Sequence, residues 1–195
     1  MIANPTTQRG VTLIEILVSL VIISLFLLGM GALQARALQG SLDSSQRSKA
    51  GWLAYELADR MRANPEGVTG GHYLTFAGNS GLCGGTPAKV CRNYHSGTSS
   101  INAASCDAVE LARFDIWELR CGFDTQGIKD DLVDFINNSD ADSRLSLSCT
   151  DNDASDANPC SEGSTYNIRI AWKTTAVDAK NKTSPNQQLT LAVRP

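Results

Sequence analysis

A long apolar run near the start of the chain dominates its hydrophobic pattern. The run extends from Val11 to Leu33 and contains a single ionisable residue, Glu15. About 20 apolar residues in a helix cross the hydrocarbon core of a membrane, so the run predicts a membrane-spanning helix. Gly29 and Gly31 interrupt it, and each would cost about 1 kcal/mol in an exposed helix.

Beyond the apolar run the pattern becomes one-sided, as in an amphipathic helix that packs on a protein core. Asn64-Pro65 ends this pattern, because proline disfavours a helical residue before it. A continuous helix from Thr12 to Ala63 would be roughly 75–80 Å long at 1.5 Å per residue. Its apolar stripe, which we expect in the core, consists of Leu38, Leu42, Trp52, Leu53, Leu57 and Met61.

The chain after the long helix is rich in glycine and other turn-forming residues. Residues 67–85 and 94–105 are therefore expected to be surface loops. A short amphipathic helix is predicted within residues 106–120, with Phe114 and Trp117 turned inward. The loops would lie on the surface of a globular domain, tied down by Cys83, Cys91 and Cys106.

Alternating apolar positions predict three strands in the last third of the chain. They cover residues 144–149, 166–172 and 188–193, and a second short helix is predicted at 130–136. Three such strands form an antiparallel sheet, whose apolar face would cover the amphipathic half of the long helix. The predicted fold class is α+β, with a long N-terminal helix, a small antiparallel sheet and loops tied by disulfides.

Six cysteines all follow the apolar run, at Cys83, Cys91, Cys106, Cys121, Cys149 and Cys160. An even number in an exported domain indicates three disulfides, and no pair has the C-x-x-C spacing of a zinc or redox site. We expect Cys149 to pair with Cys160, because this bond would close a polar loop between adjacent strands at a gain of about 2–3 kcal/mol. The other four would pair among themselves. The cysteines place the globular part outside the cytoplasm.

The length and net charge of the chain limit the classes of protein to which it can belong. The chain has 195 residues, and the roughly 160 that remain beyond the apolar run suffice for one domain with its own core. The net charge is -3, which gives no support for a nucleic-acid partner.

Glu15 is the residue whose chemistry most needs an explanation. A charge in the hydrocarbon core of a membrane costs several kcal/mol, so a carboxylate there implies a cationic partner. Cleavage after Gly10 would create an α-amino group at Val11. In a stack of identical helices, Glu15 of one subunit could then neutralise the amino group of its neighbour.

This segment resembles the class III signal of the type IV pilin superfamily, which has a short polar leader ending in glycine, threonine at mature position 2 and glutamate at mature position 5. Gly10, Thr12 and Glu15 occupy these positions. The resemblance implies cleavage after Gly10 by a prepilin peptidase, N-methylation of Val11, and roles for Thr12 and Glu15 in assembly. Val11 departs from the phenylalanine or methionine that is more frequent at the first mature position.

A second phrase resembles the minor pilins called type IV pilus modification proteins, of the PilV type. It reads Arg60-Met61-Arg62-Ala63-Asn64-Pro65. Two later segments agree with it: a cysteine followed by a short helix, from Cys106 to Arg120 with residues 115–117 inside it, and a strand at residues 166–172. The resemblance implies a minor pilin that acts in assembly, in initiation or at the tip of a pilus, and no enzyme. Adhesion, twitching motility and DNA uptake stay open as the function that the pilus serves.

The resemblance divides the chain into four parts. They are a leader at 1–10, a membrane and filament-core helix at 11–33, its amphipathic continuation at 34–64, and a periplasmic domain at 65–195. The implied partners are other pilins, the peptidase, the assembly platform and the lipid bilayer. The protein would start in the inner membrane with one span and end in a pilus.

The sequence also allows three other interpretations. A minor pseudopilin of a type II secretion system is the alternative within the superfamily. A secreted disulfide-rich enzyme or binding protein, cut near Ala35-Arg36-Ala37, is the alternative outside it, but its signal would be too long and would contain Glu15. A plain membrane anchor would have no use for Glu15.

Candidate cofactor and metal sites are weak. Asp151, Asp153, Ser155 and Glu162 are spaced like ligands of a calcium loop, but Asp156 stands where such a loop needs glycine. The two histidines, His72 and His95, lie in the expected loops without ligands at metal spacing. No cofactor or metal is therefore predicted.

Overall fold

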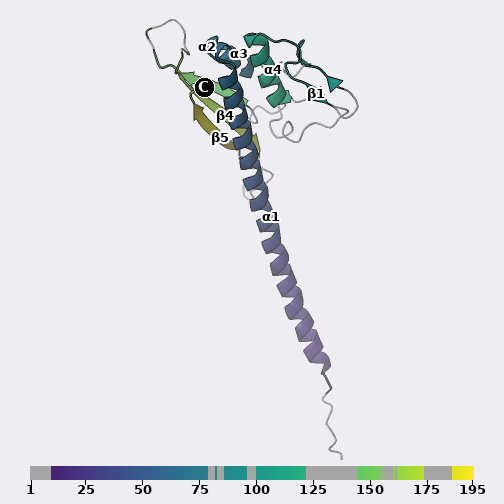
Figure 1. The fold of residues 1–195 in the computed structure, drawn as a ribbon. Helices are drawn as coiled ribbons and strands as arrows, with labels where there is room; N and C mark the ends of the chain where they lie inside the picture. Colours follow the sequence, from purple (N-terminus) through teal and green to yellow (C-terminus); the bar gives the residue numbers. More distant parts are fainter. Residues whose placement is uncertain are drawn as a thin grey trace, which may run out of the picture. The chain divides into compact units, whose positions relative to one another are not determined.

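The computed structural model describes residues 10–78, 82, 86–95, 100–121, 145–153, 155, 160, 162–173 and 186–195. The chain divides into two compact units, Met1–Leu42 and Asp43–Pro195. Figure 1 shows the helices and strands of the chain. Three predictions fall outside the described residues: the short helix at 130–136, the pairing of Cys83, and the leader up to residue 9.

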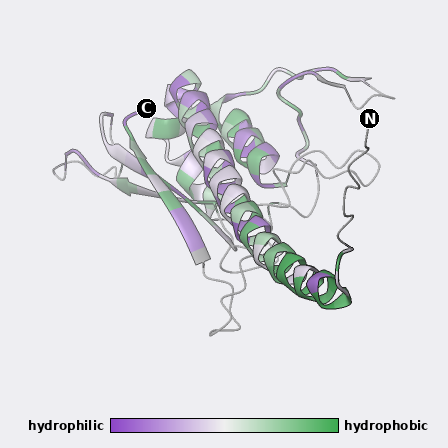
Figure 2. Cartoon of the chain, turned by 90° about the horizontal axis from the view of Figure 1, so that it is seen from below, coloured by the Kyte–Doolittle hydropathy of each residue, from purple (hydrophilic) through white to green (hydrophobic). Residues whose placement is uncertain are grey.

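The predicted long helix is present as α1, Leu13–Ala63. Throughout the first unit its large apolar side chains are exposed, and Figure 2 shows this strongly hydrophobic end of the helix in green. Ser19 and Ser24, the two serines of the apolar run, donate to the carbonyls of Ile16 and Val21 at 2.9 and 2.8 Å. Their polar groups are thus satisfied inside the helix, as an apolar environment requires. Among the described residues, α1 is the one helix long and apolar enough to cross a membrane.

The second unit contains the C-terminal part of α1, which buries one face. The buried residues are Ala50, Leu53, Ala54, Leu57, Ala58 and Met61. Their spacing of three and four residues is that of one helix face. Three alanines on this face allow neighbouring elements to approach the helix closely.

The prediction that Leu38, Leu42 and Trp52 belong to the core was wrong, because all three side chains are exposed. The first two precede Ala50, the first buried residue of α1. Trp52 precedes Met61 by about two and a half helical turns and therefore points to the opposite side. Its side chain is 80% exposed, whereas that of Trp117 is 4% exposed.

Two short helices replace part of the loop that was predicted after Pro65, so that prediction was also wrong. They are α2, Pro65–Thr69, and α3, His72–Ala77. Pro65 stands at the start of α2, where its missing N–H is not needed. Gly71 joins the helices with φ 68°, a left-handed conformation that favours glycine. His72 accordingly begins a helix instead of lying in a loop.

The predicted amphipathic helix is α4, Ala108–Cys121. Phe114 and Trp117 are buried, as expected, with ring centroids 6.1 Å apart. Asp107 and Glu110 begin the helix with a reciprocal cap: the Glu110 N–H donates to Asp107 at 2.8 Å, and the Asp107 N–H donates to Glu110 at 3.1 Å. α3 packs against α4 and against the first strand of the sheet.

The three predicted strands form the antiparallel sheet in the order β3-β4-β5, with bounds Leu145–Thr150, Thr165–Lys173 and Asn186–Val193. Leu147, Ile168 and Leu191 pair across the strands and therefore share one face. This face and the buried stripe of α1 belong to one hydrophobic cluster. The α+β prediction is confirmed.

Disulfides and a small hairpin complete the second unit. Cys149 bonds to Cys160, the pairing that the closure of the polar loop predicts, and Cys91 bonds to Cys106. Cys121 is also in a disulfide. The strands β1, Tyr94–His95, and β2, Ser100–Ile101, pair within the segment that the second disulfide closes.

The contrast between the two tryptophans predicts opposite effects on stability. Trp117→Ala should lower the free energy of unfolding by about 3–5 kcal/mol, because it removes a buried indole from the core. Trp52→Ala should change it by no more than about 0.5 kcal/mol, as for surface substitutions in general. The measurement is denaturant unfolding of the full chain in detergent micelles, followed by near-UV circular dichroism. Equal losses in the two variants would contradict the exposed position of Trp52.

Candidate functional site

The residues implicated in processing lie just before α1 begins. Gly10, Val11 and Thr12 are exposed and not helical. The Thr12 carbonyl accepts hydrogen bonds from the backbone N–H groups of Glu15 and Ile16 at 3.1 and 3.4 Å. These are the first backbone hydrogen bonds of α1. The bond after Gly10 is thus in a non-helical, exposed segment, which suits cleavage by a peptidase.

Glu15 stands in the first turn of α1 with its side chain exposed. A carboxylate at this position interacts favourably with the helix dipole. Within the described residues of the first unit the other ionisable side chain is Arg36, about six turns further along the helix. The Glu15 carboxylate takes part in no ion pair of the described residues, so a cation from another molecule can approach it.

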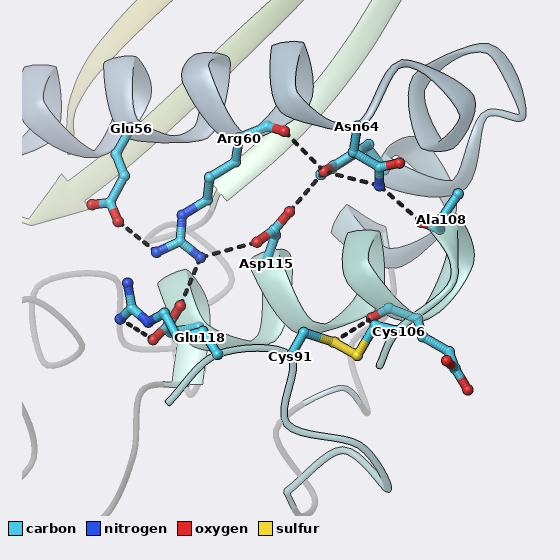
Figure 3. A network of polar contacts seen from close by, with 11 residues as sticks. Glu56, Arg60, Asn64, Cys91, Cys106, Ala108, Asp115 and Glu118 are labelled. Atoms are coloured by element: carbon cyan, nitrogen blue, oxygen red, sulfur yellow. Dashed lines mark hydrogen bonds and ion pairs between the residues drawn. A yellow bond between two sulfur atoms is a disulfide. The ribbon is translucent and has the colours of Figure 1, made fainter. Parts of the chain in front are cut away.

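A second polar cluster, which the sequence analysis missed, lies between the end of α1 and α4 (Figure 3). Arg60 Nη1 donates to Asp115 Oδ1 at 3.1 Å and to Glu118 Oε2 at 2.7 Å, while its Nη2 donates to Glu56 Oε1 at 2.5 Å. The Arg60 side chain is 15% exposed. Arg92 forms a further ion pair with Glu118. The cluster thus joins two helices through one guanidinium group.

Asp115 receives a second donor from α3. The Tyr73 hydroxyl, which is fully buried, donates to Asp115 Oδ2 at 2.7 Å. Burial raises the pKa of the Asp115 carboxyl, and the bonds from Tyr73 and Arg60 oppose this rise without cancelling it. Burial, and then the charge of Asp115, raise the pKa of Tyr73, so its hydroxyl keeps the proton that it donates.

The guanidinium group of Arg60 also keeps its proton and therefore its positive charge. Burial alone lowers the pKa of its guanidinium, but the carboxylates of Glu56 and Glu118 outweigh burial and the pKa lies above its ordinary value. The carboxylates of Glu56, Asp115 and Glu118 and the guanidinium groups of Arg60 and Arg92 therefore form one network of ion pairs. This network joins the end of α1 to α4.

Asn64 ends α1 and makes three connections at once. Its Oδ1 accepts from the Gly67 N–H at 3.1 Å and caps α2, while its Nδ2 donates to the Ala108 carbonyl at 2.8 Å. A longer contact of 3.4 Å joins Nδ2 to the Tyr73 hydroxyl. Arg60 and Asn64, four residues apart in the phrase that ends α1, thus both bind α4. The structural role of this phrase is to attach the helix end to the domain.

A sequence signal for this cluster existed. Asp115 and Glu118 are three residues apart on a helix that otherwise turns apolar residues inward, so both acids lie beside the buried face. Buried acids need partners, and the segment that ends α1 offers two cations, Arg60 and Arg62. Their pairing depends on how α1 and α4 pack, which spacing alone does not give.

The acidic segment near the Cys149–Cys160 disulfide forms hydrogen bonds within itself. Asp151 Oδ1 accepts from the Ser164 hydroxyl at 3.0 Å and from the Asp153 N–H at 3.2 Å. Asp153 Oδ1 accepts from the N–H and hydroxyl of Ser155 at 3.0 and 2.6 Å. Among the described residues, no group of three His, Cys, Asp or Glu side chains could hold a metal ion. Asp156, the residue at the glycine position, lies outside them.

The cluster predicts that Arg60 and its neighbour Arg62 differ strongly in importance. Arg60→Met should lower the free energy of unfolding by at least about 2 kcal/mol. The loss should be smaller than the roughly 3–5 kcal/mol that breaking a buried ion pair costs. The reason is that Asp115 still accepts the hydrogen bond from Tyr73, and Glu118 still pairs with Arg92. The matched control is Arg62→Met. Its exposed pair with Asp59 should contribute no more than about 1 kcal/mol.

The measurement is again unfolding of the full chain in micelles, for both variants at the same pH. A loss of similar size in both variants would mean that the cluster is no more important than a surface ion pair.

Two protein-family models match the chain, one after the other. The prokaryotic N-terminal methylation motif matches residues 5–31, and the Tt1218-like family, described as type IV pilin Tt1218, matches residues 32–117. No curated protein and no solved structure matches. The first match contains Gly10 and Glu15, and the second contains Arg60, Asn64 and Asp115. With its long apolar helix, its three-stranded sheet and these two matches, the chain belongs to the type IV pilin superfamily and carries the methylation motif of that superfamily's class III signal.

Proposed function

We propose that the protein is a minor type IV pilin of the pilus modification type. In this proposal it is made as a prepilin, cut after Gly10 and methylated at Val11. The helix of residues 11–33 then holds it in the inner membrane, residues 34–64 continue the helix, and residues 65–195 form the periplasmic domain. A pilin assembles with other pilins after the action of a prepilin peptidase, and we propose that this pilin acts in assembly, initiation or at the tip.

The observation that carries the proposal is the isolated carboxylate of Glu15. It is exposed in the first turn of α1, among apolar side chains that are also exposed. Inside a membrane or a filament core this carboxylate is poorly solvated, and a nearby positive charge would offset the loss of water. The amino group that cleavage creates at Val11 of a neighbouring subunit is such a charge, and it would add a charge-assisted hydrogen bond.

The disulfides support the orientation in the membrane. Cys91–Cys106 and Cys149–Cys160 lie in the second unit, and such bonds persist in oxidising compartments such as the periplasm. The apolar run would therefore enter the membrane with its start facing the cytoplasm. The peptidase and the assembly platform act on pilins in that membrane by family resemblance.

A minor pseudopilin of a type II secretion system is the second candidate. It shares the apolar helix, the methylation motif and the use of Glu15. The segment from Arg60 to Pro65 joins α1 to α4 through Arg60 and Asn64. Because this segment resembles the pilus modification proteins, it supports a pilin of the pilus over a pseudopilin. Recovery of the protein in sheared pili supports the pilin, and dependence of protein secretion on this chain supports the pseudopilin.

Glu15→Ala should separate membrane insertion from assembly. The variant makes the helix more apolar, so insertion and cleavage after Gly10 should persist. Entry into pili should fail, because loss of one partner from a buried ion pair costs about 3–5 kcal/mol. The fraction of the protein in sheared pili, relative to that in the inner membrane, is the quantity to measure.

Ser19→Ala is the matched control, because the Ser19 hydroxyl bonds to its own helix and should not affect assembly. If Glu15→Ala enters pili as well as the unmutated protein does, Glu15 does not neutralise a neighbouring subunit and the proposed mechanism fails.

A further inference from the structure

The outward face of the three-stranded sheet is polar and carries two arginines. One face of the sheet packs in the hydrophobic core, so the alternate residues of each strand lie on the opposite face. Arg194, which directly follows β5, lies on this side too, because it bonds to Thr165, two residues before Asn167 on β4. We call this surface the arginine face, and its exposed or half-buried members include Ser146, Ser148, Asn167, Arg169, Thr190 and Arg194.

The charge of the arginine face is opposite to that of the whole chain. The three strands contain the basic residues Arg169 and Lys173 and no Asp or Glu, whereas the chain has 20 acidic against 17 basic residues. Among the described residues the ion pairs include neither Arg169 nor Arg194, nor the carboxyl group of Pro195 that follows Arg194. Both positive charges are therefore available to an anionic partner.

Each arginine is held in a defined orientation by a neighbouring strand. Arg169 Nε donates to Gln188 Oε1 at 2.8 Å, and Arg194 Nε donates to Thr165 Oγ1 at 3.2 Å. Within the described part of the chain, the two terminal nitrogens of each guanidinium have no hydrogen-bond partner. These nitrogens form a planar pair of donors that matches the two oxygens of a carboxylate. The orientation is set before binding, which reduces the entropy that binding costs.

The surroundings of the arginines favour a hydrated partner. The described side chains next to them are hydroxyl and amide groups, among them Ser148, Asn167, Gln188 and Thr190. A stable protein interface has an apolar or aromatic centre, and the described residues of this face supply none. The face also lacks the aromatic rings on which single-stranded nucleic acid stacks its bases. A polysaccharide, whose own surface consists of hydroxyl groups, fits such a face better.

We propose that the arginine face binds a polysaccharide whose sugars carry carboxylate groups. Arg169 pairs with Thr190 across the strands, and Arg194 lies four residues further along, about 13 Å at the rise of a strand. One extended sugar chain along the sheet therefore reaches both arginines, which bind its carboxylates while the hydroxyl and amide groups bind its hydroxyls. This inference goes beyond the proposed function and does not depend on a pilus.

The first test compares two forms of one polymer. The full chain in detergent micelles is titrated with polygalacturonate and with the same polymer fully methyl-esterified, which keeps the sugars but removes the negative charge. Polygalacturonate should bind at least about tenfold more tightly, and its affinity should fall as salt is added, because salt screens exposed charges. Equal affinity for both forms, or no binding of polygalacturonate, would overturn the inference.

The second test distinguishes the arginine face from a general effect of charge. The double variant Arg169→Gln with Arg194→Gln should bind polygalacturonate about tenfold more weakly, as expected for the loss of two exposed ion pairs. The matched control, Arg62→Gln with Arg113→Gln, removes two other exposed arginines and should bind as the unmutated chain does. Near-UV circular dichroism of both variants verifies that the fold is retained.

Other partners give different results in the same experiments. Equal weakening in the control variant would show that binding follows net charge alone and would overturn the inference. Tighter binding of single- or double-stranded DNA than of polygalacturonate would do the same. Loss of the Arg169 and Arg194 double variant from sheared pili would assign the face to a neighbouring protein, again against the inference. Absence of the unmutated chain from pili would contradict the proposed function alone, since polymer binding is measured on the purified chain.

Discussion

The constraint on which this structure depends is that one continuous helix meets different surroundings along its length. In the first unit α1 exposes apolar side chains on every side, which only lipid or another protein can cover. In the second unit the same helix buries one narrow face of alanine, leucine and methionine residues, and the rest of the fold is built on that face. The helix can therefore pass its apolar end to another environment without losing the core of the domain.

The polar cluster at the end of α1 complements the hydrophobic stripe. Apolar packing is non-directional, whereas the bonds of Arg60 to Asp115 and Glu118 fix which part of α4 meets the helix. Asn64 does the same for α2 and for the start of α4. The segment that ends α1 thus connects α1, α2 and α4 to one another.

The sequence was sufficient for features that repeat with a regular period or follow from single residues. Pro65 located the end of α1, and alternation of apolar residues located the three strands. The packing of α1 was harder to predict, because Trp52 looks like a core residue in a list of large apolar side chains. Ala54 and Ala58, which are buried instead, carry little signal of their own. The Arg60 cluster joins residues that are 55 and 58 positions apart, so only the packed fold brings them together.

The identity of the chain's first peptide in sheared, purified pili tests most directly whether it is processed and enters the fibre. Arg9 and Arg36 are consecutive basic residues, so trypsin distinguishes the processed from the unprocessed chain. A processed pilin gives a peptide that begins at Val11, ends at Arg36 and carries a methylated amino group. A peptide that begins at Gly10 would show that the leader is retained, and absence of the chain from pili would contradict its assignment to the fibre.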